Sequence, residues 1–253
     1  MDLGLRCKRA IVTGGTRGIG RKIVELLVAE GCDVGFCARN EKEIGEAVTA
    51  LSGPGRNVIG GIVDVTDGDR LRSWITETAI ALGGLDILIP SVSALVAGAS
   101  EGAWRHGLEV DVLGTVHAVE AAIPFLEKSK TASIVAISST AAINISGGVR
   151  AYSGLKAAII NYLSALSTNL ASKGIRANTV SPSAIFFKGG IWDKRKRENP
   201  DMYAAAVNRS PMGRLGTPEE VANAVVFLAS PVASYISGTN LVVDGAATTR
   251  VQY

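Results

Sequence analysis

Short β-rich runs alternate with stretches of helical periodicity along almost the whole chain, and this alternation constrains the fold most strongly. The run RAIVTGG closes on glycines, and IGRKIVELLVAEG follows with helical spacing that ends at Gly31. Such alternation is typical of a parallel sheet with helices on both faces. The expected strands are RAIVTGG, DVGFCAR, NVIGGIVDV, LDILIPS, ASIVAISS, IRANTVSP and NLVVDG. We therefore expect an α/β fold with a doubly wound, seven-stranded parallel sheet in one domain over residues 1–253.

One helical stretch is long, and one region interrupts the alternation. The long helical stretch covers residues 101–127 and is notably apolar. Residues 186–213 are rich in Gly, Pro and charge, and we expect them to form an insertion above the sheet edge that acts as a substrate lid. No segment has the composition of a linker that would divide the chain into two domains.

Composition excludes several functional classes. Of the 253 residues 47% are apolar, and the net charge is only +3, so nucleic acid is not expected as a partner. The cysteines Cys7, Cys32 and Cys37 form no CxxC pair, which argues against a disulfide framework or a metal site and for a reducing cytoplasm. We expect no signal peptide, because the first apolar run is short and stops at Gly14-Gly15, and no membrane span, because no apolar run is long enough to form one.

The stretch TGGTRGIG, residues 13–20, follows an expected strand and opens an expected helix. In this context Gly14 permits a sharp turn, and Gly18 and Gly20 let backbone N–H groups approach a diphosphate closely. A glycine-rich turn without a ligand is the alternative. The predicted cofactor loop comprises Gly14, Thr16, Arg17, Gly18, Ile19 and Gly20.

A second pattern places Tyr152 four positions before Lys156 in the helical stretch AYSGLKAAI. Such pairs are common on helices, so YxxxK alone is a weak signal. Together with the TGxxxGxG turn, however, it resembles the short-chain dehydrogenase/reductase family. DVTD at 64–67, RLGTPEEVANAVVFLAS and YISGTNLVVDG match further family segments in order and spacing. The resemblance covers nearly the whole chain and implies a Rossmann-type fold that binds a nicotinamide dinucleotide.

The resemblance also implies an active site. In the family a tyrosine is the general acid/base, a lysine favours its phenolate and holds the nicotinamide ribose, and a serine holds the substrate oxygen. Tyr152 and Lys156 match the first two, and Ser139, which precedes Tyr152 by 13 residues, matches the serine. Ser138 is the nearest rival and is expected to be structural. The family's fourth residue is an asparagine that holds a water beside the lysine, and Asp111 stands at that position.

A tyrosine whose pKa is lowered by its surroundings can catalyse proton transfer to or from a carbonyl or alcohol oxygen. Free tyrosine has a pKa of about 10, and a nearby ammonium or a positive nicotinamide ring favours its anionic form. Such a phenol can give a proton to a carbonyl oxygen as hydride arrives, or take one from an alcohol. We therefore expect a carbonyl reductase or alcohol dehydrogenase acting on a small carbonyl or alcohol substrate.

The residues directly after the second expected strand indicate which nicotinamide cofactor the chain prefers. A carboxylate there would bind a ribose 2′-hydroxyl and repel a 2′-phosphate, but the chain has Ala38-Arg39-Asn40. Arg17 and Arg39 could clamp a phosphate, although solvated surface arginines are the alternative. We therefore expect NADP(H) rather than NAD(H). By resemblance, the remaining cofactor contacts are Asp64 and Val65 at the adenine and Pro182 and Ile185 near the carboxamide.

The chain departs from the family pattern at three places, which bear on the substrate pocket, the pH optimum and cofactor binding. Residues 90–93 read PSVS where the family has NNAG, which is either a tolerated variant or a reshaped substrate pocket. Asp111 keeps the carbonyl that orients the water, but its charge should soften the pull of Lys156 on Tyr152 and shift the pH optimum. Phe187 replaces a threonine that contacts the carboxamide, so cofactor affinity could be lower or the lid could close differently.

The substrate and the partners are less determined. The expected pocket walls are Val92–Ala97, residues 140–149 and the lid segment FFKGGIW, whose apolar side chains suit an uncharged ketone or aldehyde. The basic run at 193–201 is expected to be a solvated helix face, with an attractor for an anionic substrate as the alternative.

The apolar helices around 101–127 and after Tyr152 predict a homotetramer, with a dimer as second choice. A 3-oxoacyl-carrier-protein reductase and a cofactor-binding sensor without turnover are the alternative functions.

Overall fold

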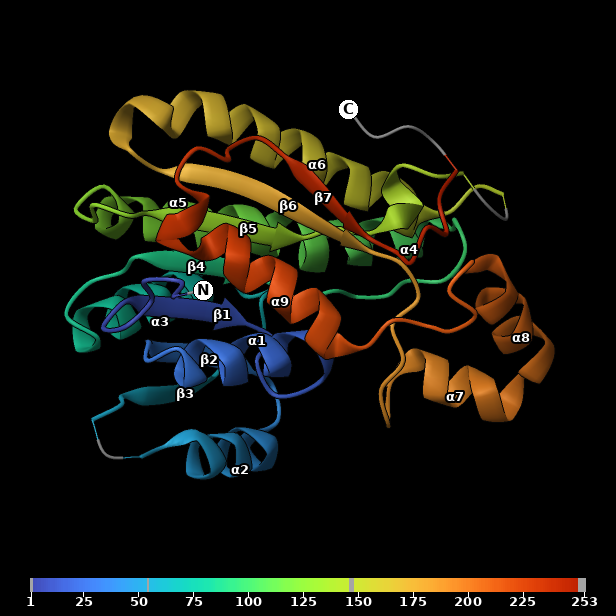
Figure 1. Cartoon of the computed structure of the whole chain (residues 1–253), viewed down its shortest axis with the longest axis horizontal. Helices are drawn as coiled ribbons and strands as arrows, with labels where there is room; N and C mark the ends of the chain where they lie inside the picture. Colours follow the sequence, from blue (N-terminus) through green and yellow to red (C-terminus); the bar gives the residue numbers. More distant parts are fainter. Residues whose placement is uncertain (1, 54, 146–147, 250–253) are drawn as a thin grey trace.

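The computed structural model describes residues 2–53, 55–145 and 148–249. Within these residues the strands form one parallel sheet in the order β3-β2-β1-β4-β5-β6-β7, which confirms the predicted doubly wound, seven-stranded sheet (Figure 1). The strands are β1 (Arg9–Thr13), β2 (Asp33–Ala38), β3 (Val58–Ile62), β4 (Ile87–Pro90), β5 (Ser133–Ile137), β6 (Arg176–Pro182) and β7 (Asn240–Val243).

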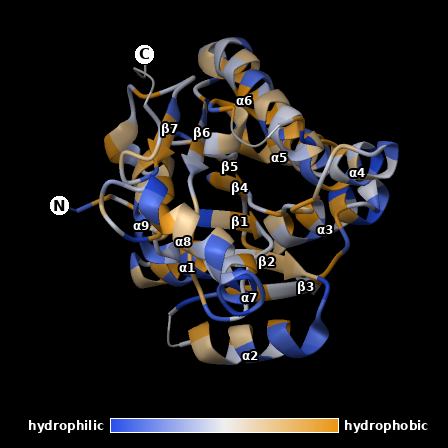
Figure 2. Cartoon of the chain, turned by 90° about the vertical axis from the view of Figure 1, so that its right-hand side faces the viewer, coloured by the Kyte–Doolittle hydropathy of each residue, from blue (hydrophilic) through white to orange (hydrophobic). Residues whose placement is uncertain are grey.

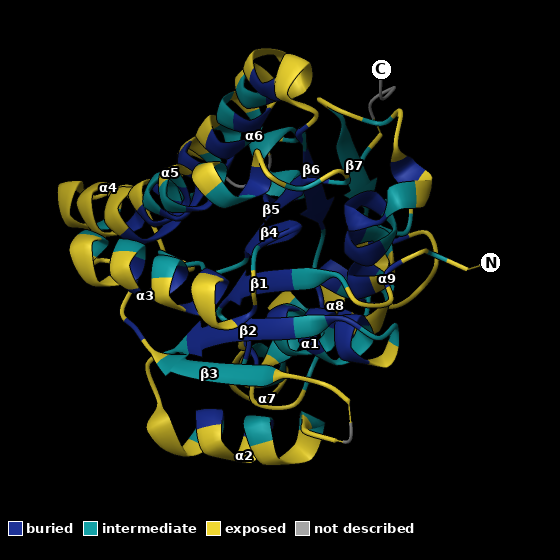
Figure 3. Cartoon of the chain, turned by 90° about the vertical axis from the view of Figure 1, so that its left-hand side faces the viewer, coloured by how far each residue is buried: buried dark blue, intermediate teal, exposed yellow. Residues whose placement is uncertain are grey.

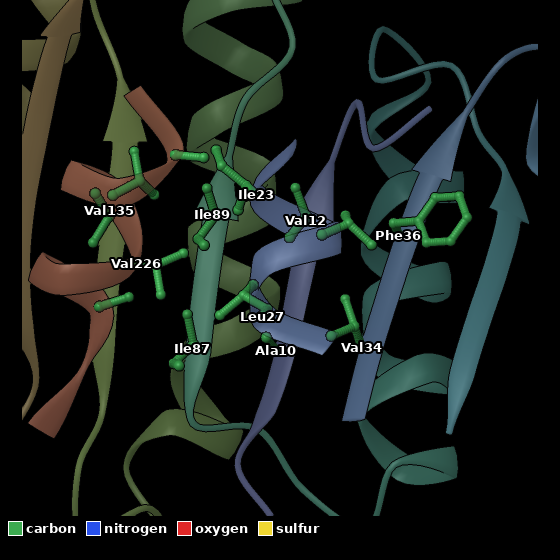
Figure 4. Close-up of a cluster of buried hydrophobic side chains, with 14 of the residues drawn as sticks. Ala10, Val12, Ile23, Leu27, Val34, Phe36, Ile87, Ile89, Val135 and Val226 are labelled. Atoms are coloured by element: carbon green, nitrogen blue, oxygen red, sulfur yellow. The ribbon is translucent and has the colours of Figure 1, made fainter. Parts of the chain in front are cut away.

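Helices cover both faces of the sheet, as expected for parallel strands joined by crossover connections. One face packs on α1 (Gly18–Ala29), α2 (Glu41–Leu51) and α9 (Pro218–Ala229). Figure 4 shows part of this core, where Ile23 and Leu27 of α1 and Val226 of α9 meet strand residues such as Val12 and Ile89. The other face packs on α3 (Gly68–Ala81), α5 (Gly114–Leu126) and α6 (Ala151–Leu170).

The register brings the carboxyl ends of the strands to one edge of the sheet. Thr13 at the end of β1 lies between Cys37 of β2 and Pro90 of β4. The strand order reverses between β1 and β4, and ligands of doubly wound folds bind at such a reversal. Figure 2 looks onto this carboxyl edge, and Figure 3 looks onto the opposite, amino edge.

The predicted helical stretch over 101–127 is confirmed, and it contains a π-helical turn. It consists of α4 (Glu101–Gly107), a π-helical turn (Leu108–Leu113) and α5. A Cβ at Gly107 would clash with Leu155 of α6, so glycine lets the end of α4 approach α6 closely. A π-helical turn commonly marks a functional position, and here it carries Asp111.

The region expected to be a lid lies outside the sheet and its helical layers. It contains two short helices, α7 (Ile191–Glu198) and α8 (Pro200–Arg209), which project beyond the carboxyl edge (Figure 1). An isolated bridge between Ile185 and Gly216 joins the chain on either side of these helices. In the described part of the chain, no helix is long and apolar enough to cross a membrane.

Candidate active site

The glycine loop between β1 and α1 is fixed on the end of β2. The N–H groups of Gly14 and Gly15 both donate to the carbonyl oxygen of Cys37, at 2.9 and 3.1 Å. Gly14 has a φ of 77°, in the left-handed region that favours glycine, and a Cβ at Gly20 would clash with the Gly14 carbonyl oxygen. Arg17, at the N-cap of α1, makes no side-chain cap, so the helix keeps its N-terminal donors for a ligand. This cradle fits the diphosphate of a dinucleotide.

The ring of Phe187 covers this loop. A Cβ placed at Gly18 would lie 2.7 Å from Phe187 Cζ, and one placed at Gly190 would lie 2.7 Å from Phe187 Cε1. The ring is therefore packed between the start of α1 and the segment leading into α7. Of the two residues expected near the carboxamide, Ile185 is buried and Pro182 ends β6.

The side of the site expected to hold adenine contains an exposed ion pair. Arg39 Nη1 lies 3.8 Å from Asp64 Oδ2, and both side chains are largely exposed. Hydrogen bonds from Thr66 lower the pKa of Asp64, with a smaller contribution from Arg39. Val65, the next residue in the chain, is buried. An exposed pair of this length is weak, so the Arg39 guanidinium can exchange the carboxylate for another anion.

A contact that the sequence analysis did not predict links the glycine loop to α2. Thr16 Oγ1 donates to Glu43 Oε2 at 2.9 Å. Glu43 lies in the first turn of α2, where Asn40 caps the helix by accepting from the Glu43 N–H. No sequence pattern indicated this contact, because the two residues are 27 positions apart and meet only through the β1–β2 register.

The catalytic candidates gather around the end of β5. Ser138 Oγ donates to the carbonyl oxygen of Lys156 at 2.9 Å, the structural role expected for it. Ser139 is nearly buried, and its Oγ accepts from the Ala141 N–H at 3.2 Å. This bond uses a lone pair and leaves the hydroxyl proton of Ser139 free to donate to a substrate oxygen. Lys156 Nζ lies 5.9 Å from the centre of the Tyr152 ring, one helical turn away.

Lys156 is buried and held by two oxygens. Its ammonium donates to the carbonyl oxygen of Ile137 at 3.0 Å and lies 2.9 Å from Asp111 Oδ1. Lys156 and Asp111 expose only 2% and 1% of their side chains, so this ion pair is shielded from water. The contact with Oδ1 is close but poorly aligned for a hydrogen bond, and no other described residue donates to that oxygen. The negative charge that the sequence placed near Lys156 is thus in direct contact with it.

The rest of Asp111 is engaged as well. Its Oδ2 accepts from the Ala94 N–H at 2.9 Å, and its carbonyl oxygen accepts from Thr115 Oγ1 at 2.7 Å. That carbonyl oxygen was expected to orient a water, and neither the Thr115 nor the Ala94 contact was predicted from the sequence. A threonine four residues after a functional helix residue was the available signal, because such hydroxyls commonly bond the carbonyl one turn back.

The departure at residues 90–93 is accommodated in the structure. Pro90 ends β4 beside Thr13, so its missing N–H falls at the last position of the ladder. The next N–H, that of Ser91, donates to Thr13 Oγ1 at 3.1 Å. The pocket wall expected at 140–149 is described except for Ser146 and Gly147, which lie outside the described residues.

The cations of α7 do not form a uniform solvated face. Arg195 lies over the Trp192 ring at 4.5 Å, and Lys196 lies over the rings of Phe186 and Tyr203 at 5.6 and 5.5 Å. Burial lowers the pKa of Arg195, and the like charge of Arg150 lowers it further. In the described part of the chain no group of His, Cys, Asp or Glu side chains could hold a metal ion.

Comparisons with known proteins identify the family of the chain. Residues 14–248 match a family model described as enoyl-(acyl carrier protein) reductase. The chain is 37% identical to isoepoxydon dehydrogenase patN of Penicillium expansum, over 100% of this chain and 99% of that protein. It is 31% identical to 3-oxoacyl-[acyl-carrier-protein] reductase FabG of Chlamydia pneumoniae, over 98% of this chain and 100% of that one.

Solved structures share the fold. An NADPH-bound short-chain oxidoreductase from Pseudomonas aeruginosa PAO1, described as containing an atypical catalytic centre, superposes with a TM-score of 0.88. It is 31% identical in sequence, and the match covers 96% of this chain and 98% of that one. The chain therefore belongs to the short-chain dehydrogenase/reductase family. It is an oxidoreductase of carbonyl and alcohol groups that uses a nicotinamide dinucleotide.

Proposed function

We propose that this chain is an NADP(H)-dependent carbonyl reductase and alcohol dehydrogenase that uses Tyr152 as its general acid/base. The observation that carries the proposal is the grouping of Ser139, Tyr152 and Lys156 around the end of β5, at the same edge of the sheet as the glycine loop. The whole carboxyl edge would form the cofactor site within one domain, and α7 and α8 would form its lid.

The chain's own residues account for the proton transfer. Bound NADPH supplies the hydride. Ser139 donates a hydrogen bond that holds the carbonyl oxygen, because its own Oγ already accepts from Ala141. Tyr152 gives its proton to that oxygen as negative charge develops there. Lys156 keeps a positive charge within 5.9 Å of the Tyr152 ring and so favours the phenolate that remains.

The preference for NADP(H) over NAD(H) rests on the end of β2. No carboxylate stands at Ala38, Arg39 or Asn40, and Arg39 has only a weak, exposed partner in Asp64. Arg17 is exposed at the start of α1. Two guanidiniums of this kind can bind a 2′-phosphate through charge-assisted hydrogen bonds.

The test is oxidation of NADPH and NADH by the purified protein with a panel of ketones, aldehydes and acyl thioesters. We expect turnover with NADPH that falls by at least about a hundredfold in Tyr152→Phe, the low end of what general acid–base catalysis contributes. Turnover with NADH alone would contradict the cofactor assignment. NADPH binding without turnover on any carbonyl would favour a sensor over an enzyme.

A 3-oxoacyl-carrier-protein reductase is the second candidate, and the cations at the lid favour it. Arg150 precedes the catalytic helix, Arg195 faces its charge, and neither has a carboxylate partner within the described residues. An anionic phosphopantetheine arm would match such a pair. The discriminating measurement compares an acyl thioester on phosphopantetheine with the same acyl group on uncharged N-acetylcysteamine. A preference for the charged thioester of about tenfold or more in kcat/KM would support this candidate, and equal values would reject it.

We further propose a homotetramer, with a dimer as second choice, in a cytoplasmic setting. Trp104, Leu108 and Leu113 expose between 37% and 43% of their surface along α4 and the π-helical turn. Apolar residues along one ridge of a helix favour a second copy as the partner. Light scattering coupled to gel filtration measures the mass directly, and a monomer would reject this part of the proposal.

A further inference from the structure

Both carboxylate oxygens of Asp111 face hydrogen-bond donors. Oδ1 lies 2.9 Å from the Lys156 ammonium, and Oδ2 accepts from the Ala94 N–H at 2.9 Å. Ala94 belongs to the loop after β4 that was expected to wall the substrate pocket. One buried side chain therefore connects the catalytic lysine to the substrate loop.

This arrangement favours an acid over an amide. An ionised carboxylate accepts at both oxygens, whereas an asparagine offers one acceptor and one NH₂ donor. In either orientation, the NH₂ of an asparagine would face the ammonium of Lys156 or the N–H of Ala94. A buried donor that faces another donor loses its hydrogen bond and adds repulsion. The aspartate is thus matched to its two neighbours in this chain, including the altered loop after β4.

Asp111 is also the anion that faces Lys156. From β5 the lysine meets the neutral carbonyl of Ile137, and from its own helix it meets Tyr152. Among the described residues no other carboxylate forms an ion pair with it. The carboxylate offsets the ammonium's charge at close range in a water-shielded site, where such effects are strong.

We propose that Asp111 is a positioning residue that holds Lys156 and the substrate loop together and, by offsetting the lysine charge, sets the pH range in which Tyr152 works. This role rests on the proposed function. In alcohol oxidation Tyr152 acts as the phenolate, so the rate rises with pH along an acid limb. Removing the Asp111 charge leaves the ammonium uncompensated, which favours the phenolate and moves that limb to lower pH.

The experiment measures kcat/KM for alcohol oxidation against pH in Asp111→Asn and in a matched control, Asp86→Asn. Asp86 also pairs with a cation in a buried setting, but at the amino edge of the sheet, far from the reaction. We expect Asp111→Asn to lower the plateau rate about tenfold to a hundredfold, since the lysine loses an anchor, and to move the acid limb down by at least half a pH unit. Asp86→Asn should lower the thermal midpoint and leave the limb in place.

Asp111→Glu keeps the charge and tests the same idea if Asp111→Asn folds poorly. It should lower the plateau rate because the carboxylate is displaced, yet keep the acid limb within a few tenths of a pH unit of the unchanged protein. An acid limb that is unchanged in Asp111→Asn, moved to higher pH, or moved in Asp111→Glu as in Asp111→Asn would overturn the proposed role. Absence of turnover in the unchanged protein would overturn the proposed function and this role with it.

Discussion

At the amino edge of the sheet Asp86 meets Arg9, whereas at the carboxyl edge Asp111 meets Lys156 (Figure 3 shows the amino edge). Asp86 accepts from the Arg9 N–H, Nε and Nη2 and from Ser129 Oγ, at 2.6 to 3.0 Å. Burial alone would raise the pKa of Asp86, but these hydrogen bonds outweigh it and hold that pKa below its ordinary value. Asp111 instead has one aligned donor on its carboxylate and one close ammonium.

The difference in hydrogen bonding indicates different roles for the two ion pairs. A buried charge that accepts four hydrogen bonds is fixed in one state, and it stabilises the fold around β1 and β4. A buried pair with incomplete hydrogen bonding keeps its charges responsive to a neighbour, and we propose that this neighbour is Tyr152. Perturbed or under-satisfied charged groups of this second kind gather at functional sites.

The largest effect is expected from Asp86→Ala. Without the carboxylate, the partly buried guanidinium of Arg9 and the Ser129 hydroxyl lose their partner, so the free energy of unfolding should fall by about 3 kcal/mol. Chemical denaturation followed by circular dichroism measures this loss. Turnover at a temperature where the variant is folded should stay within about twofold, because the amino edge contains no reacting group. An unchanged free energy of unfolding in Asp86→Ala would contradict the stabilising role given to the Asp86–Arg9 pair.

A smaller effect is expected from Phe187→Thr at the carboxyl edge. The substitution uncovers the start of α1 and supplies a hydroxyl donor, so NADPH should bind about fivefold more tightly, which is roughly 1 kcal/mol for one added hydrogen bond. Fluorescence titration of NADPH measures the Kd, and Phe187→Leu, which keeps an apolar side chain, is the control. Equal affinity in Phe187→Thr and the unchanged protein would show that the ring does not hinder the cofactor.

The smallest effect is expected in the pH dependence of stability, to which Asp86 at the amino edge contributes in acid. The pKa of Asp86 is lower in the folded chain than its ordinary value of 3.8. Its contribution to stability is therefore complete above that ordinary value and is lost as pH falls through the lower folded pKa. We expect the free energy of unfolding to decline less steeply below pH 4 in Asp86→Asn than in the unchanged protein. Parallel slopes in urea titrations across this range would contradict the assignment.

Several local features of this protein could be predicted from residue types and their spacing. The glycine spacing at 14–20 predicts the turn, because Gly14 has a positive φ and Gly20 has no room for a Cβ. The structural role of Ser138 followed from its place beside Ser139 at the end of a strand. The helical stretch over 101–127 was also predicted, but its apolar character does not reveal the π-helical turn at Leu108–Leu113.

The sequence by itself determined the fold class and the family, and it predicted the cofactor loop and the set of Ser139, Tyr152 and Lys156, which stay predictions. These features depend on residue types at short, fixed spacings, which the backbone geometry of strands, turns and helices dictates. Only the tertiary structure decided that Asp111 contacts Lys156 and the loop at Ala94, and that Phe187 lies over Gly18. Those contacts join segments 17 to 169 residues apart in the chain. Their geometry depends on how the helices and loops pack on the sheet, which a pattern along the chain does not specify.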